Sequence, residues 1–240
     1  MFEVKIQRLF FVVGLVFCSS SQAAELEKAE VSKIHPTQFA VGKKEVEIKE
    51  MILQKIIKQD KLKKYLKANP GIVIVGPGKV MYLIDGHHHA SSLHMGGIED
   101  IYVEIVKDWS DDTPAQFWEK MQDKKFVYLY DEAGKKKPYT DLPVRIEDLR
   151  DDPYRTIAWL VRKAKAFENQ KVPFQEFEYA EFLRSRMSVD FSTEKAADDS
   201  LQKALDLVTS SDASHLPGYT GKRPTCDYTT LLKDLLKIED

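Results

Sequence analysis

Four of the chain's six histidines lie close together, between positions 87 and 94. The three consecutive ones follow the dipeptide Asp85-Gly86, which itself follows the apolar run 80–84. A strand that turns through a glycine into a helix exposes free backbone N–H groups, and titratable side chains at such a turn commonly bind a phosphate or a metal ion. These residues therefore predict a functional site at 85–94, without indicating its substrate.

The first interpretation of this turn is phosphoryl chemistry. The N–H groups at a helix start carry a partial positive charge, and Gly86 lets an anion approach the backbone closely. One of the three consecutive histidines would act as general acid or base, oriented by Asp85. The candidate catalytic residues are Asp85, His87, His88 and His89, and the candidate phosphate-binding residues are Gly86, His87, His88, His89 and Ser91.

The second interpretation is a divalent-metal site, and the third is a structural turn without chemistry. A metal would be bound by Asp85 with two of His87, His89 and His94. The metal site predicted from the sequence is Asp85, His87 and His94.

Helical geometry limits the metal interpretation. In a helix that starts at Gly86, the spacing places His87, Ser91 and His94 on one face. The residues expected to face the core are Ala90, Leu93 and Gly97. Successive residues are about 100° apart around a helix axis, so three consecutive histidines cannot bind one metal ion from a regular helix. A metal site would need irregular geometry or a distant ligand such as His35.

Apolar periodicity predicts the elements that position this turn. Residues 45–66 carry apolar side chains at three- and four-residue spacing, which predicts one amphipathic helix. The runs 72–75 and 80–84 predict a hairpin, because a Gly-Pro-Gly turn stands between them. Strands are also predicted over 101–106 and 126–130. Helices are predicted to start at Thr113-Pro114, Asp152-Pro153, Pro173, Thr193 and Asp227.

The fold class that follows is α+β, with a small α/β domain followed by a helical C-terminal region. We divide the chain into a signal peptide over 1–23, the α/β domain over 24–110, an α/β extension packed on it over 111–150, and the helical region over 151–240.

The N-terminus has the pattern of a cleavable export signal. Lys5 and Arg8 precede an apolar core over 9–17, which is too short to span a bilayer at about 20 residues. Ser21-Gln22-Ala23 fits the cleavage pattern, so cleavage is expected after Ala23, with Ala24 as a neighbouring site. An uncleaved anchor is the alternative. A lipoprotein signal through Cys18 is disfavoured by Phe17. The mature protein is expected to be periplasmic or secreted, without a transmembrane segment.

Composition does not single out nucleic acid as a partner. Cleavage changes the formal net charge of the 240-residue chain from −2 to −3. It also leaves Cys226 as the only cysteine, which we interpret as a bystander without a chemical role. The lysines within and just after the predicted first helix are Lys55, Lys58, Lys61, Lys63, Lys64 and Lys67. We interpret them as a solvated face. The expected partner is a phosphate-containing ligand, and a nucleic acid would lack a basic patch to support it.

Several short motifs, taken in order, resemble one family. They are His35-Pro36-Thr37-Gln38, Asp85-Gly86-His87-His88-His89-Ala90, Leu142-Pro143, Asp151-Asp152-Pro153-Tyr154-Arg155, Glu181-Phe182-Leu183-Arg184 and Leu216-Pro217-Gly218-Tyr219. The chain resembles the ParB-like nuclease family, a branch of the ParB/sulfiredoxin superfamily, from about residue 31 to 219. The resemblance assigns the superfamily fold to residues 24–110.

The resemblance implies a phosphate-binding turn that opens a helix. Relatives carry an arginine in that turn, whereas this chain has His88 or His89, and histidine lacks the arginine fork. Superfamily members include partitioning proteins that bind a nucleotide, ATP-dependent sulfiredoxins and free-serine kinases. Because an exported protein meets essentially no ATP, hydrolysis of a phosphodiester or another phosphate ester is the favoured reaction.

The alternative is a non-catalytic exported protein that binds an anion or a partner, such as an effector. In that case Tyr154, Arg155, Glu181 and Arg184 are of interest, although an ion pair between Arg155 and Glu181 that ties two helices together would explain them structurally. No cofactor is assigned beyond a divalent metal ion.

Overall fold

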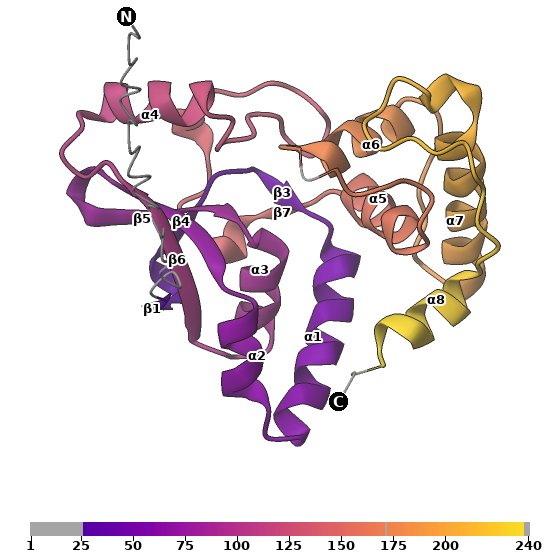
Figure 1. The fold of residues 1–240 in the computed structure, drawn as a ribbon, viewed down its shortest axis with the longest axis horizontal. Helices are drawn as coiled ribbons and strands as arrows, with labels where there is room; N and C mark the ends of the chain where they lie inside the picture. The colour runs from indigo at the N-terminus through magenta and orange to yellow at the C-terminus, as the bar shows by residue number, and fades with distance from the viewer. Residues whose placement is uncertain (1–25, 171, 238–240) are drawn as a thin grey trace, which may run out of the picture.

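A five-stranded mixed sheet forms the N-terminal half of the computed structural model, which describes residues 26–170 and 172–237. The signal peptide predicted over 1–23, with its cleavage site, lies outside the described residues. The strand order is β1-β6-β4-β5-β2 (Figure 1). The strands are β1 (Leu26–Glu30), β2 (Ile34–Pro36), β4 (Gly71–Gly76), β5 (Val80–Asp85) and β6 (Asp100–Asp108).

The sheet brings the segment after β2 against the histidine turn. β4 and β5 pair antiparallel, which confirms the predicted hairpin. β2 pairs parallel with β5, with His35 opposite Tyr82 and Pro36 opposite Leu83. Because parallel strands end at the same edge of a sheet, the residues after Pro36 lie beside the end of β5, where the turn begins.

Three helices cover one face of the sheet: α1 (Lys43–Lys58), α2 (Leu62–Ala68) and α3 (His87–Met95). Their core includes Leu53, Val73, Leu83 and Leu93. The prediction of one helix over 45–66 is wrong at its centre, because the chain leaves α1 through Asp60 at φ 56° and restarts as α2.

The helix α4 (Pro114–Asp123) lies on the other face, with Phe117 and Met121 packed against Ile74. Thr113 and Gln116 form a capping box at its start, as the Thr-Pro pair indicates. The strand predicted over 126–130 is wrong. This segment forms only an isolated bridge, Tyr130 with Lys136, because its alternating apolar side chains fill the core under α4 rather than a sheet position.

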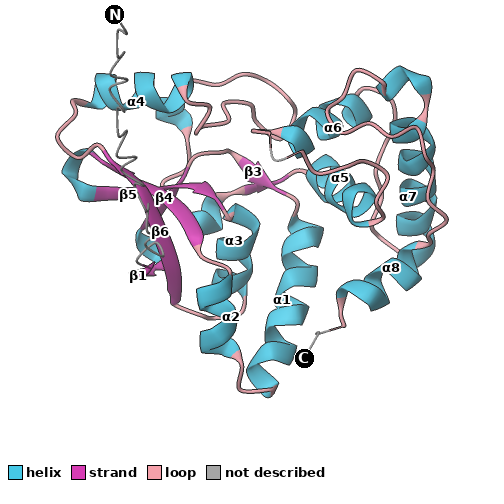
Figure 2. Cartoon of the chain, in the orientation of Figure 1, coloured by secondary structure: helices cyan, strands magenta, loops and turns pink. Residues whose placement is uncertain are grey.

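The C-terminal helices build a second core. They are α5 (Pro153–Lys163), α6 (Gln175–Arg184), α7 (Glu194–Thr209) and α8 (Tyr228–Leu235). The helix starts predicted at Asp152-Pro153, Thr193 and Asp227 are confirmed, and the side chains of Asp152, Thr193 and Asp227 cap these helices. The start predicted at Pro173 is wrong, since Phe174 adopts φ 63° and α6 begins after it. The parallel pair β3 (Ala40–Val41) and β7 (Arg150–Asp151) joins the two halves (Figure 2).

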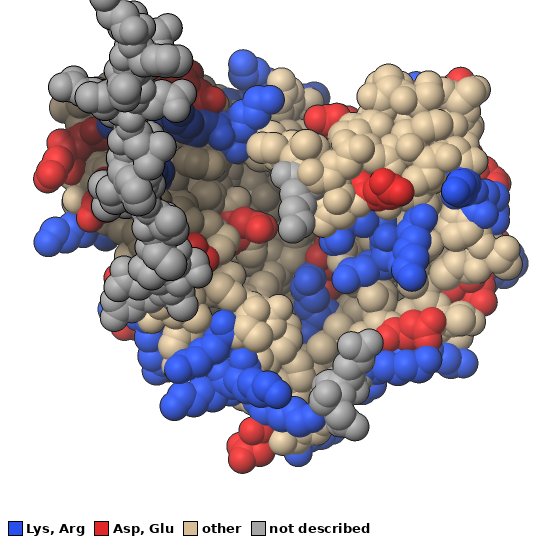
Figure 3. Space-filling model, in the orientation of Figure 1, with Lys and Arg blue, Asp and Glu red and all other residues tan. Residues whose placement is uncertain are grey.

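The α+β class with a helical C-terminal region is confirmed. Short 3-10 helices occupy Val31–Lys33, Pro77–Lys79, Tyr139–Asp141, Ile146–Asp148 and Ser211–Ala213. Within the described residues, no helix is long and apolar enough to cross a membrane. Of the six lysines interpreted above as a solvated face, five are exposed and Lys61, the N-cap of α2, is half-buried. Figure 3 shows basic side chains gathered over this end of the molecule.

Candidate functional site

A cavity of about 670 Å³ opens between the sheet half and the C-terminal helices. Figure 3 shows it as the central hollow of the molecule. The start of α3 forms one wall, the first two turns of α1 a second, and α5 with the start of α6 a third. All three consecutive histidines line this cavity, and its other walls were not predicted from the sequence.

The turn leaves backbone N–H groups without intrahelical partners at the start of α3. Gly86 is the N-cap of α3 with φ 96°, a conformation that other residues adopt only with strain. No side chain caps the helix, and its first hydrogen bond runs from the Ala90 N–H to the Gly86 carbonyl at 2.8 Å. The N–H groups of residues 87–89 therefore remain for another acceptor. Asp85 is exposed, and its Oδ1 accepts the Gly86 N–H at 2.8 Å.

His87 is engaged by the backbone on both ring nitrogens. Its Nε2 accepts the Thr37 N–H at 3.1 Å, and the ring also hydrogen-bonds the Leu83 carbonyl. A neutral imidazole has one donor and one acceptor, so both are used. Burial, and then the nearby Arg155 charge, lower the pKa of His87 to about 3. In this geometry His87 anchors the segment after β2 through the Thr37 N–H, and its ring is neutral.

His88 binds the backbone in the same way, through Nε2, which accepts the Gly42 N–H at 3.0 Å. The same nitrogen lies 3.3 Å from Glu45 Oε2. This contact is not an ion pair, because a ring nitrogen that accepts an N–H carries no proton, and because burial, with the charge of Arg155, holds the pKa of His88 well below its ordinary value.

The remaining predicted site residues are scattered. His89 is buried, its Nε2 has no hydrogen-bond partner, and burial, followed by the Lys49 charge, lowers its pKa to about 4. Ser91 Oγ is buried without a partner and does not line the cavity. His94 is exposed, 4.0 Å from Glu147. No three His, Cys, Asp or Glu side chains of the described chain could hold a metal ion together, so Asp85, His87 and His94 are not gathered as a metal site.

One buried cation of the cavity, Arg155, comes from α5. Arg155 is 5% exposed, and its Nε and Nη1 have no hydrogen-bond partner. Its Nη2 lies 3.8 Å from Glu176 Oε2, and its Cζ lies 3.4 Å from the ring centre of Phe177, so the guanidinium is held flat on that ring. Burial lowers the pKa of Arg155, and Glu176 and Glu45 oppose the shift. Unused donors on a buried charge are costly, which indicates a missing acceptor.

Two carboxylates accompany this arginine. Glu45 is buried on α1 at 3.5 Å from Lys49, and burial raises its pKa to about 7 although the Lys49 charge opposes the shift. Glu176, in the first turn of α6, accepts a hydrogen bond from Arg162 Nε. Gly42 lets α1 start against α5, since a Cβ there would lie 2.3 Å from Thr156 Oγ1. This close approach sets Glu45 in the same cavity as Arg155.

A family model described as "Putative ParB-like nuclease" matches residues 27–185. The chain belongs to the ParB-like nuclease family. The ParB-like chain is also similar to protein Atu1540 from Agrobacterium tumefaciens, whose crystal structure aligns with a TM-score of 0.73 and 34% identity, over 82% of this chain and 98% of that one. No match is found among curated proteins.

The ParB-like chain departs from the sequence-based expectation in where its arginine stands. The turn lacks the arginine that the resemblance implies, but Arg155 reaches the same cavity from α5. The expected ion pair between Arg155 and Glu181 is wrong, because Glu176 faces Arg155 and Glu181 contacts Arg184. One signal in the sequence could have found the site: Arg155 and Arg162 are seven residues apart, on one face of a helix that is otherwise apolar there.

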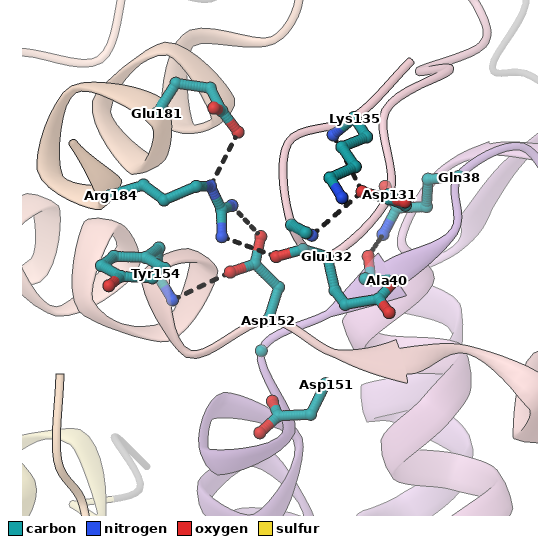
Figure 4. A network of polar contacts seen from close by, with 12 residues as sticks. Gln38, Ala40, Asp131, Glu132, Lys135, Asp151, Asp152, Tyr154, Glu181 and Arg184 are labelled. Carbon is teal, nitrogen blue, oxygen red and sulfur yellow. Dashed lines mark hydrogen bonds and ion pairs between the residues drawn. The ribbon is translucent and has the colours of Figure 1, made fainter. Parts of the chain in front are cut away.

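Arg184 ties this helical half of the ParB-like protein to the loop before it (Figure 4). Its guanidinium donates to Asp152 Oδ2 at 2.7 Å, to the Glu132 carbonyl at 2.6 Å and to Glu181 Oε1 at 3.2 Å. Asp152 Oδ1 meanwhile accepts the Tyr154 N–H and caps α5. The network fixes the start of α5, the helix in which Arg155 directly follows Tyr154.

Replacing Arg184 with alanine is expected to lower the free energy of unfolding by about 3 kcal/mol, because it leaves the buried Asp152 carboxylate without its cation. Urea denaturation monitored by circular dichroism measures this. As a control, Arg145→Ala removes an exposed pair with Asp148 and should change stability little. Equal effects of the two substitutions would contradict a structural role specific to Arg184.

Replacing His87 with alanine is expected to lower the free energy of unfolding by about 2–4 kcal/mol at pH 7.5, since the Thr37 N–H is left buried without an acceptor and a cavity forms. The loss should be smaller at pH 5. The pKa of His87 in the folded protein, about 3, lies below its ordinary value of 6.5. Between these two pH values the unfolded state binds one more proton than the folded state, so the folded wild type becomes less stable as the pH falls.

Denaturation of both proteins at pH 5 and pH 7.5 checks this. The exposed His94 is the matched control, and His94→Ala should change little at either pH. An His87→Ala loss that is the same at both pH values would show that His87 does not titrate as its burial implies.

Proposed function

We propose that this ParB-like protein binds a phosphate-bearing ligand in the central cavity and hydrolyses a phosphate ester there. The observation that carries the proposal is Arg155, a buried guanidinium with two unused nitrogen donors that lines the same cavity as the uncapped start of α3. Arginine and helix N–H groups together are a strong combination for a phosphate. The family membership supports the same choice of ligand.

Glu45 is the residue best suited to move a proton in this reaction. His87 and His88 use their Nε2 atoms on backbone N–H groups, whereas Glu45 Oε2 has no hydrogen-bond partner. A pKa of about 7 leaves part of the carboxylate ionised at neutral pH, as a general base requires. Glu45 would accept a proton from water as the water oxygen attacks phosphorus and the ester P–O bond breaks. The leaving alkoxide would take up a proton from solvent and depart as the alcohol.

A non-catalytic anion-binding function is the second candidate. The observation that favours it is that backbone N–H groups occupy the Nε2 atoms of His87 and His88. Among the three histidines of the turn, only His89 then has an Nε2 without a hydrogen-bond partner. In either case we propose that the protein acts after export through the signal peptide at 1–23, in the periplasm or outside the cell.

Titration of the purified protein with inorganic phosphate in a calorimeter tests the proposal. Binding saturable at millimolar phosphate or below is expected, and generic phosphate mono- and diesters are then assayed for turnover with and without divalent cations. Binding without turnover would favour the non-catalytic function. Absence of phosphate binding would contradict both the hydrolase and the anion-binding protein at this cavity.

A further inference from the structure

The cations of the cavity are not equally available to a ligand. Arg162 donates to the Glu176 carboxylate, and Lys49 lies 3.5 Å from the Glu45 carboxylate. Arg155 is different, because its Nε and Nη1 have no partner and its one carboxylate contact is 3.8 Å long. Two of the three cations that α1 and α5 place in the cavity are therefore matched by carboxylates, and Arg155 is left for one anionic group. A fourth cation, Lys125, is exposed and lines the cavity next to Phe126.

Aromatic side chains form another part of the cavity wall. Phe126, Tyr128, Phe174 and Phe177 line the cavity, and each is half-buried. Phe177 is covered on its faces, by Arg155 at 3.4 Å and by Tyr128 at 3.8 Å between ring centres. Phe174 meets Tyr128 and Phe177 only in tilted and edge contacts, at 5.2 and 5.5 Å, so within the described chain no ring stacks on it.

We infer that the ligand carries a single phosphate group joined to a planar or apolar ring, the phosphate on Arg155 and the start of α3 and the ring on Phe174. This inference rests on the proposed function and names its substrate class. A second phosphate next to the first would meet the carboxylates of Glu176 and Glu45, which line the cavity with Arg155. A planar ring gains apolar burial and stacking on Phe174, which is otherwise a half-exposed aromatic surface beside charged groups.

The acidic side chains also argue against a nucleic-acid strand. A second cavity, of about 590 Å³, shares Tyr128, Phe174 and Phe177 with the first and is lined by two carboxylates, Glu178 and Glu181, and one guanidinium, Arg186. That guanidinium donates to the Phe182 carbonyl and packs on the Phe182 ring. A chain of phosphodiesters that continued past the aromatic wall would run onto these carboxylates, whereas a neutral ring would end there at no electrostatic cost.

Calorimetric titration with phenyl phosphate and methyl phosphate tests the ring. Wild-type protein is expected to bind phenyl phosphate at least tenfold more tightly, and Phe174→Leu, which keeps apolar volume but removes the aromatic face, should reduce the preference to threefold or less with methyl phosphate affinity unchanged. Tyr130→Leu is the matched control outside the first cavity and should keep the preference. Equal affinities of the wild type for the two esters would overturn the inference while leaving the proposed function intact.

Replacing Glu176 with glutamine tests the limit of one phosphate. Wild-type protein should bind inorganic diphosphate no more tightly than phosphate. Glu176→Gln frees Arg162, so its ratio of diphosphate to phosphate affinity should rise at least tenfold. Glu178→Gln, the same change on an exposed residue of α6, should leave the ratio unchanged.

A wild type that prefers diphosphate or a DNA tetramer to phosphate overturns the inference even if the Glu176 variant does not fold. Failure of every phosphate compound to bind would instead reject the proposed function together with the inference.

Discussion

Replacing Arg155 with methionine is expected to weaken phosphate binding at least 100-fold without lowering the free energy of unfolding. Two hydrogen bonds from a charged donor to a phosphate are worth about 1.5–3 kcal/mol each, and both would be lost. Stability should hold, because a buried and partly unsatisfied charge is replaced by an apolar chain of similar length that still packs on Phe177. Loss of binding with retained stability is the pattern of a binding residue.

Two further variants sharpen this result. Arg155→Lys keeps the charge but not the flat fork, so phosphate should bind at least tenfold more weakly than to the wild type. Arg150→Met removes an exposed cation paired with Glu132 and should leave phosphate binding unchanged. An Arg155→Met protein that is destabilised but binds phosphate normally would show that Arg155 is a structural residue.

Replacing Glu45 with glutamine is expected to lower kcat about 10²–10⁴-fold for any phosphate ester that the wild type hydrolyses, because the general base is lost. Wild-type activity should rise with pH, with a midpoint near 7, since the base must be deprotonated and burial raises the pKa of Glu45 to about 7. The residual activity of the variant should lack this rise. Steady-state kinetics between pH 5 and pH 9 measure both effects.

The pH dependence of the free energy of unfolding tests the pKa of Glu45 independently of activity. Its folded pKa of about 7 exceeds the ordinary 4.5, so the folded state binds the extra proton between these values and loses stability as pH rises through them. Glu45→Gln should therefore be more stable relative to the wild type at pH 8 than at pH 5. The exposed Glu47 on the same helix, changed to glutamine, is the control for both measurements. Activity within threefold of the wild type in Glu45→Gln would remove it from the mechanism.

The histidine turn illustrates how far local sequence reaches. Gly86 followed by residues able to start a helix is a local pattern, and the structure has the predicted strand, turn and helix there. The roles of the histidines depend on partners 46 and 50 residues away, the N–H groups of Gly42 and Thr37. No periodicity of residues 85–97 could reveal that these two donors lack other acceptors.

The errors in the predicted elements have the same origin. Residues 126–130 alternate as a strand does, yet their side chains fill the core beneath α4 without a sheet neighbour. Residues 45–66 keep a helical period through a break at Asp60, because the apolar faces of α1 and α2 both meet the same core.

The sequence by itself determined the α+β class, the hairpin, most helix starts, the family and the position of the turn, because each depends on residues close together in the chain or on motifs quoted from it. Tertiary structure alone decided which side chains meet in the cavity. Arg155, Glu45 and Glu176 come from three helices, and their burial, not their spacing, leaves one guanidinium unsatisfied and raises the pKa of one carboxyl to about 7. Burial is a property of the packed chain, so these two features became visible only when α1, α5 and α6 were placed around the start of α3.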